Sequence, residues 1–325
     1  MTEQTLSYDP DAPDIQLHEH FLGVQERFRA RHDKALADVE KLYHYTTAEG
    51  FKSILEGREF WATHVAHLND SSELEYGLNL LHSQLDVLKN DRQNKYVNAF
   101  IDAAHEQFQF SARLLFAAYV VCLCENGNLL SQWRGYGSGG GGYSIGLSPH
   151  RTSAARLDGE ARMLDDHGLV HLRQVIYDES EQKSLLDDLL AGLVPILERH
   201  GPVMHREKFR EEIVEYAVMR MQMALADLLP CFKNPSFEEE QEWRYVYFAT
   251  RYPVPNQRFR VRNGNFVPFL SLRLLGKENG PLQVSKIFCG PTLNSHLTVN
   301  TVHELTELLG HTGVEVLPSG IPLRF

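Results

Sequence analysis

A histidine between two tyrosines is the first feature of the sequence that could contact a sugar. The stretch at residues 42–47, LYHYTT, predicts a short strand, and His44, Tyr45 and Thr46 lie where the chain passes from this strand into a helix. An imidazole at a strand end can hydrogen-bond a sugar hydroxyl. The pattern also fits a core histidine whose ring is bound by the backbone, so both interpretations stay open.

A glycine-rich stretch, RGYGSGGGGY at residues 134–143, has the composition of a phosphate-binding loop. Gly137, Gly139 and Gly142 form G-x-G-x-x-G. A dinucleotide-binding glycine turn follows a strand and opens a helix, because the helix N-terminus then faces the pyrophosphate. Here a short helix or turn is predicted before the glycines and a strand after them, so this fingerprint does not apply. The stretch is interpreted as a mobile loop over a pocket or as part of another kind of nucleotide site.

The residues around these glycines offer groups for an aromatic ring and for a phosphate. Trp133 and Tyr136 could stack on a flat ring, and Tyr143 stands at the far end of the glycine run. Arg134 could bind a phosphate with two hydrogen bonds, and Ser131 belongs to the same cluster. The alternative is a helix end that packs its aromatic side chains into the core.

An acidic stretch before a predicted strand offers carboxylates. In FEEEQEWRY, Glu240, Glu242 and Arg244 would share one face if the strand extended back to Glu240. A carboxylate in a buried strand is costly unless it is paired, and Arg244 is the partner nearest in sequence. An exposed acidic turn with a purely structural ion pair is the alternative.

The order of predicted elements favours an α+β fold, because segments typical of a β-meander are separated from groups of helices. Residues 1–14 are expected to be disordered and residues 15–40 to form a helical arm. Residues 41–325 are expected to form a single domain with a helical insert at about 179–230. The helix after the His44 strand is expected to begin with a Thr46–Glu49 capping box, to carry an apolar stripe of Phe51, Ile54 and Leu55, and to have Gly57 as its C-cap.

Composition and charge exclude several classes of protein. The formal net charge of −11 argues against nucleic-acid binding through a broadly basic face, although Arg251, Arg258, Arg260 and Arg262 could line a local groove or a solvated hairpin. The C-L-C spacing of Cys122 and Cys124 does not match a zinc site, and H-E-x-x-H is absent. Neither a signal peptide nor a membrane span is predicted, so a cytoplasmic protein is expected.

Four stretches of the chain together resemble a bacterial family of unknown function, DUF2971, over most of residues 41–295. They are LYHYTTAEGFKSILEGREFWATHVAHLNDSSELEYG, CLCENGNLLSQWRGYGSGGGGYSIGL, FEEEQEWRYVYF and KIFCGP. Their layout also resembles the ADP-ribosyltransferase superfamily of the His-Tyr-Glu type. This second resemblance implies split antiparallel β-sheets with flanking helices and a helical insertion.

The superfamily resemblance also implies roles for individual residues. His44 would contact the nicotinamide ribose, and Tyr136 or Tyr143 would stack on nicotinamide. Glu242 would hold the ribose 2′-hydroxyl and stabilise the positive charge that develops on the sugar. Glu240 before it gives an E-x-E spacing that some arginine-directed members of the superfamily show.

The resulting expectation is an NAD-dependent ADP-ribosyltransferase, a toxin-like or anti-phage defence effector. NAD would be its substrate, no metal would be required, and a protein or nucleic acid would be the acceptor, with a cognate regulator or inhibitor as a further partner. A nucleotide-sensing or protein-interaction module of the same fold is the first alternative. A metal-dependent nuclease or hydrolase that uses Glu240, Glu242 and nearby histidines is the second.

Overall fold

The computed structural model describes residues 11–68, 73–92, 94–110, 118–137, 141–149, 154–157, 170–203, 207–249, 253–275, 284–292 and 294–322. Most of the segment predicted to be disordered, residues 1–10, lies outside these ranges, as do Ser138–Gly140 of the glycine run and Arg251. The contacts of the chain divide it into two compact units. The first comprises residues 1–31, 71–116 and 176–235, and the second comprises residues 32–70, 117–175 and 236–325.

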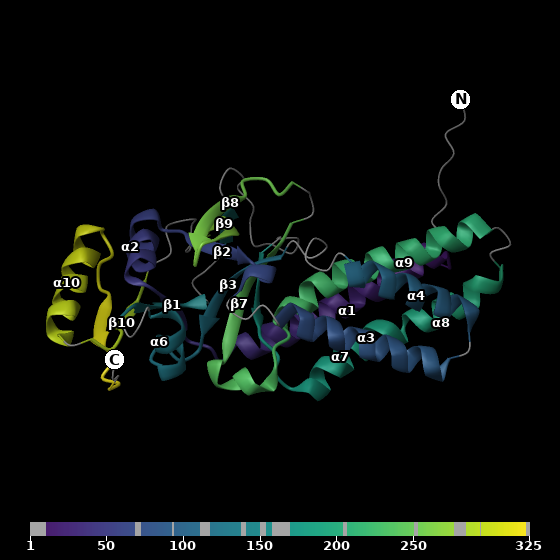
Figure 1. Ribbon diagram of the computed structural model, residues 1–325, viewed down its shortest axis with the longest axis horizontal. Coiled ribbons are helices and arrows are strands. Elements are labelled where there is room, and N and C mark those ends of the chain that lie inside the picture. The colour runs from purple at the N-terminus through teal and green to yellow at the C-terminus, as the bar shows by residue number, and fades with distance from the viewer. Residues whose placement is uncertain are drawn as a thin grey trace, which may run out of the picture. The chain divides into compact units, whose positions relative to one another are not determined.

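The first unit is helical and contains the helical segment predicted at about 179–230. Within it α3 packs against α4 and α7, and α4 packs against α8 and α9 (Figure 1). Its core is built from side chains with no more than 1% exposure, among them Leu81, Phe100, Leu189 and Leu225. Its helices are α1 (Pro13–Leu36, as far as Arg31), α3 (Glu73–Asp91), α4 (Lys95–Phe110), α7 (Glu179–Ala191), α8 (Leu193–His200) and α9 (Glu207–Leu228).

The described residues of the second unit form a branched β-sheet and helices α2, α6 and α10, which pack with it (Figure 1). Its helices are α2 (Ala48–Gly57), α6 (Leu130–Tyr136) and α10 (Ser295–Leu308). Its strands are β1 (Leu42–Thr46), β2 (Phe60–His64), β3 (Ala118–Cys124), β4 (Tyr143–Leu147), β5 (Ala154–Leu157), β6 (Val170–Gln174), β7 (Glu242–Phe248), β8 (Arg258–Arg262), β9 (Asn265–Leu275), β10 (Lys286–Cys289) and β11 (Glu315–Pro318). All pairings are antiparallel except that of β10 with β11. The predicted α+β class is therefore confirmed.

Strand β3 is the branch point of the sheet. All seven of its residues pair with β7, which therefore occupies one whole edge. The other edge is shared, because Cys124 pairs with Tyr43 of β1 while Val120 and Tyr119 pair with Thr63 and His64 of β2. Between these two pairings the ladder on this edge of β3 is interrupted, and we call this interruption, with β1 on one side and β2 on the other, the wedge. The β3 residues that face the wedge are Val121, Cys122 and Leu123.

One face of this sheet carries the main core of the unit. Phe51, Ile54 and Leu55 of α2 pack there, as the apolar spacing of this helix predicted. Strand residues on the same face are Leu123 of β3 and Trp243 of β7, both nearly fully buried. These contacts fix the direction in which β1 enters α2.

The boundaries of α2 differ from the prediction by one residue at each end. Thr47, and not Thr46, is the N-cap, because its side chain accepts a hydrogen bond from the Gly50 amide at 3.2 Å. At the other end the left-handed residue is Arg58, with φ of 54°, and its amide donates to the Ile54 carbonyl. The predicted Gly57 terminus is therefore the last helical residue. β5 was not predicted as a strand at all.

Two glycines of the glycine run, Gly137 and Gly142, are packed tightly against backbone. The Gly137 amide donates to the Trp133 carbonyl, and Gly142, with φ of +120°, accepts a hydrogen bond from Gly290. A Cβ at Gly142 would lie 2.9 Å from the Thr46 carbonyl oxygen and 2.9 Å from Gly137 Cα. Glycine is required here because the chain crosses itself at close range in a backbone conformation that other residues rarely adopt.

We expect Gly142→Ala to lower the free energy of unfolding by about 1–3 kcal/mol, since it adds both left-handed strain and a clash with backbone. Gly141→Ala is the matched control, because the nearest atom to its added Cβ would be 3.9 Å away. We expect the control to change stability by less than about 0.5 kcal/mol. Urea denaturation of the three proteins measures both values, and equal effects of the two substitutions would contradict this account.

Candidate functional site

His44 lies in the wedge between β1 and β2. Its Nδ1 donates a hydrogen bond to the Cys122 carbonyl at 2.9 Å, since a carbonyl oxygen only accepts. Its ring meets the edge of the Phe60 ring, with centroids 5.3 Å apart and planes at 87°. The side chain therefore satisfies a β3 carbonyl at the point where the ladder is interrupted, and the neutral ring keeps Nε2 as an acceptor.

The electrostatic surroundings favour this neutral form. Burial lowers the pKa of His44 below its ordinary value of 6.5, the hydrogen bond to Cys122 opposes this shift, and the positive charge of Arg260 adds to it. Because the folded state binds this proton less readily than the unfolded chain, the contribution of His44 to stability is lost as the pH falls below about 6.5.

Two other predicted residues share the sheet face of His44. Thr46 and Tyr143 are direct cross-strand partners, and antiparallel partners project to the same face. Tyr143 stacks on Phe51 of α2, with ring centroids 4.2 Å apart and planes at 21°. Burial, with a smaller effect of Cys289, raises the pKa of the Tyr143 phenol. Tyr143 is only partly buried, so part of its surface stays accessible.

Tyr45 and Trp133 join α6 to the opposite face of β1. Their ring centroids lie 4.8 Å apart, and Trp133 is fully buried. The Tyr45 hydroxyl donates to the Asn126 carbonyl at 2.7 Å and accepts from the Leu129 amide at 2.8 Å. The indole N–H of Trp133 donates to Asn128 Oδ1 at 3.0 Å. These groups anchor the start of α6, so the Trp133 ring packs within the protein, as the alternative sequence interpretation held.

The other predicted residues of α6 divide between surface and core. Ser131 and Arg134 are exposed, whereas Tyr136 packs against the cluster of Tyr45, Cys124 and Trp133. Tyr136 and Tyr143, the two candidates for a stacking residue, thus belong to different hydrophobic clusters.

Glu242 lies on the same sheet face as Tyr45. Tyr43, Cys124 and Glu242 are aligned across β1, β3 and β7, so their side chains project to one side. Arg244 Nε donates to Glu242 Oε1 at 2.8 Å, and Arg244 Nη2 donates to Oε2 at 2.7 Å. The side chains of this pair are only 4% and 2% exposed. The pairing expected from the sequence is therefore present, as a buried bidentate ion pair.

Glu240 does not share this strand. It ends a 3₁₀ turn, η5 (Pro235–Glu240), and Gln241 adopts a left-handed conformation with φ of 43°. The Gln241 amide donates to the Glu238 carbonyl, which closes the turn. The strand does not extend back to Glu240, because β7 begins at Glu242, so the condition for a face shared by Glu240 and Glu242 is not met.

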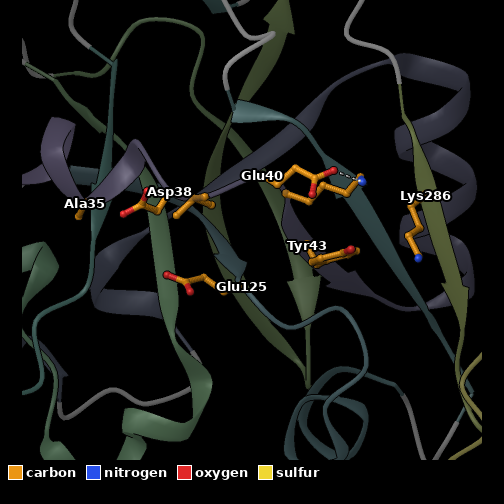
Figure 2. A pocket seen from close by; sticks show the side chains of 8 residues that line it. Ala35, Asp38, Glu40, Tyr43, Glu125 and Lys286 are labelled. Atoms are coloured by element: carbon orange, nitrogen blue, oxygen red, sulfur yellow. Dashed lines mark hydrogen bonds and ion pairs between the residues drawn. The ribbon is translucent and has the colours of Figure 1, made fainter.

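A pocket of about 510 Å³ lies beside Tyr43 (Figure 2). Lys41 and Lys286 line it together with Asp38 and Glu125, so its walls carry both signs of charge. None of the predicted site residues lines this pocket.

Two further observations concern metal binding and membrane-spanning helices. In the part of the chain that the structure describes, no group of three or more His, Cys, Asp or Glu side chains is placed to hold a metal ion. No helix in the described ranges has the length and apolar character needed to cross a membrane.

The Glu242–Arg244 pair gives a stability prediction. Either Glu242→Leu or Arg244→Leu leaves one charge buried without its partner, so we expect each to cost about 3–5 kcal/mol of unfolding free energy. The double variant removes both charges, and we expect it to cost clearly less than the sum of the single changes. A double-mutant cycle by chemical denaturation measures this coupling, and strictly additive costs would show that the pair is not the dominant interaction.

No curated protein and no solved structure matches the chain. One family model, described as a protein of unknown function (DUF2971), matches residues 132–245. The matched segment begins in α6 and ends in β7, and it contains Trp133, Arg134, Tyr136, Tyr143, Glu240 and Glu242. Over these residues the match supports the resemblance to the DUF2971 family predicted from the sequence.

Proposed function

We propose that this protein is an NAD-dependent ADP-ribosyltransferase, an effector that modifies a protein or nucleic acid. The observation that carries the proposal is the position of His44 in the wedge. Its Nδ1 is held by Cys122, which leaves Nε2 as the acceptor that a ribose hydroxyl requires.

The reaction needs few groups beyond this one. The bond between nicotinamide and C1′ of the ribose breaks, nicotinamide leaves with the electron pair, and positive charge develops on the sugar. A fixed carboxylate stabilises that charge, and the acceptor nucleophile then attacks C1′ and loses its proton. In this proposal Glu242 supplies the carboxylate, with Arg244 fixing its orientation, and Thr46 and Tyr143 border the nicotinamide end beside His44.

One observation favours a second function. Both carboxylate oxygens of Glu242 accept hydrogen bonds from Arg244, and the side chain is 4% exposed, which is typical of a structural pair. His44 and Glu242 also project to opposite faces of the sheet. A module that binds a nucleotide without turning it over uses the wedge in the same way and needs no free carboxylate.

Nicotinamide release from NAD by the purified chain separates the two functions. We expect release by the wild type, and a decrease of about 10²–10³-fold in Glu242→Gln, the size of effect seen when a group that stabilises transition-state charge is lost. His44→Gln should also reduce the rate. Glu239→Gln is the matched control, because this carboxylate is exposed and only three residues away.

Each variant is first checked for folding by its thermal unfolding, because Glu242 is part of the buried pair. Release that increases when cell lysate is added would support a macromolecular acceptor. No release by the folded wild type, with NAD bound and recovered unchanged, would contradict the transferase and favour the binding module.

A further inference from the structure

The pocket beside Tyr43 carries charged groups that the proposed function does not use (Figure 2). All of its lining residues belong to the second unit. They come from residues 35–43, which lead into β1, from Glu125, which follows β3, and from Lys286, the first residue of β10. Its volume of about 510 Å³ is in the range of pockets that hold small molecules.

Tyr43 and Lys286 stand on one face of the sheet with a glycine between them. Both pair with Gly146 of β4, so their side chains project to the same side. A Cβ at Gly146 would lie 2.8 Å from Cε1 of Tyr43 and 3.2 Å from Cβ of Lys286, so this glycine leaves the space that the two side chains use. Burial raises the pKa of the Tyr43 phenol, and the positive charges of Lys286 and Lys41 oppose this rise. The phenol stays protonated at neutral pH and offers a donor beside two ammonium groups.

The two lysines of the pocket have ion pairs that a ligand can replace. Lys41 pairs with Glu40 at 2.8 Å, and Lys286 pairs with Glu315 at 3.1 Å. The lysine side chains are 30% and 21% exposed, whereas those of their partners are 86% and 56% exposed. Ion pairs with such exposed carboxylates contribute little to stability, because water screens them. A ligand carboxylate can therefore take their place at little cost.

The other side of the pocket carries carboxylates without cations. Glu125 Oε1 accepts a hydrogen bond from the indole N–H of Trp243 at 2.8 Å, and this ring is fully buried, so the carboxylate is held in place. Neither Glu125 nor Asp38 forms an ion pair with another residue in the described part of the chain. Figure 2 shows Asp38 and Glu125 on one side of the pocket and Lys286 on the other. The pocket therefore has an acidic end and a basic end.

We infer that this pocket binds a short peptide with free termini. Its carboxylate is bound at the basic end by Lys41, Lys286 and the Tyr43 hydroxyl, and its ammonium group is bound at the acidic end by Glu125 and Asp38. A single amino acid fits less well, because its two charges lie on one carbon atom and those of the pocket lie on opposite sides. A nucleotide also fits less well, because its phosphates would add negative charge beside two carboxylates. The inference is independent of the proposed function, since the pocket contains none of the residues assigned to the transferase.

Isothermal titration of the full chain with alanyl-leucine, its N-acetyl derivative and its C-terminal amide tests the inference. Each derivative lacks one charge of the dipeptide, so we expect each to bind the wild type about 10-fold more weakly, the effect of a lost hydrogen bond to a charged group. Lys286→Gln should weaken alanyl-leucine binding by a similar factor and leave the affinity for the amide unchanged, since the amide has no carboxylate. Glu125→Gln should weaken alanyl-leucine binding and leave the affinity for the N-acetyl derivative unchanged.

Lys52→Gln is the matched control, because Lys52 is an exposed lysine of α2 that pairs with Glu56, and it should keep wild-type affinity for all three ligands. Tyr43→Phe removes only the hydroxyl and carries the test if Lys286→Gln does not fold; it should weaken the dipeptide more than the amide. Three results would overturn the inference: a folded wild type that does not bind alanyl-leucine at millimolar concentration, equal affinities of the wild type for the three ligands, or a Lys286→Gln variant that loses affinity equally for the dipeptide and the amide.

Discussion

The two edges of β3 are the constraint on which the candidate site depends. A strand has one row of hydrogen-bonding groups on each edge, and β7 occupies one row completely. β1 and β2 must share the other row, and they pair with its opposite ends. The backbone groups between them need other partners, because buried polar groups without partners are costly. His44 meets this need for Cys122, and in doing so it is fixed in the wedge.

The second constraint is charge. Glu242 and Arg244 neutralise each other on one face of the sheet, where both are nearly inaccessible to water. Arg260 of β8 has a hydroxyl and an aromatic ring as its contacts, and no carboxylate among the described residues. The internal pair stabilises the sheet. The proposed activity and the alternative binding role would both place a nucleotide at the wedge, and they differ in what Glu242 does.

The sequence predicted several local elements of the second unit, because the apolar spacing of α2 and the strand patterns of β1 and β7 depend on nearby residues. The boundaries were less predictable. Gln241 and Arg58 adopt left-handed conformations that glycine or asparagine adopts more readily, so nothing in their residue types signalled the turn before β7 or the end of α2.

The branch at β3 could not be predicted either, since it joins residues far apart in sequence, such as Tyr43 with Cys124 and Cys124 with Glu242. Successive side chains of a strand project to alternate faces of the sheet, so His44 and Glu242 project to opposite faces, although both were expected to contact one ligand. The arginine-rich sequence of β8 also does not reveal that Arg258 lies near the Glu59 carboxylate whereas Arg260 has a hydroxyl and an aromatic ring as its contacts. The sequence allowed Trp133 either to stack on a flat ring or to pack into the core. The ring is completely buried against Tyr45 of β1, a contact between residues far apart in sequence.

The central claim is that the wedge binds the nucleotide. A crystal structure of the chain soaked with ADP-ribose tests it most directly. The account predicts the ribose within hydrogen-bonding distance of His44 Nε2. ADP-ribose bound instead in the pocket beside Tyr43 and Lys286, with the wedge unoccupied, would contradict it.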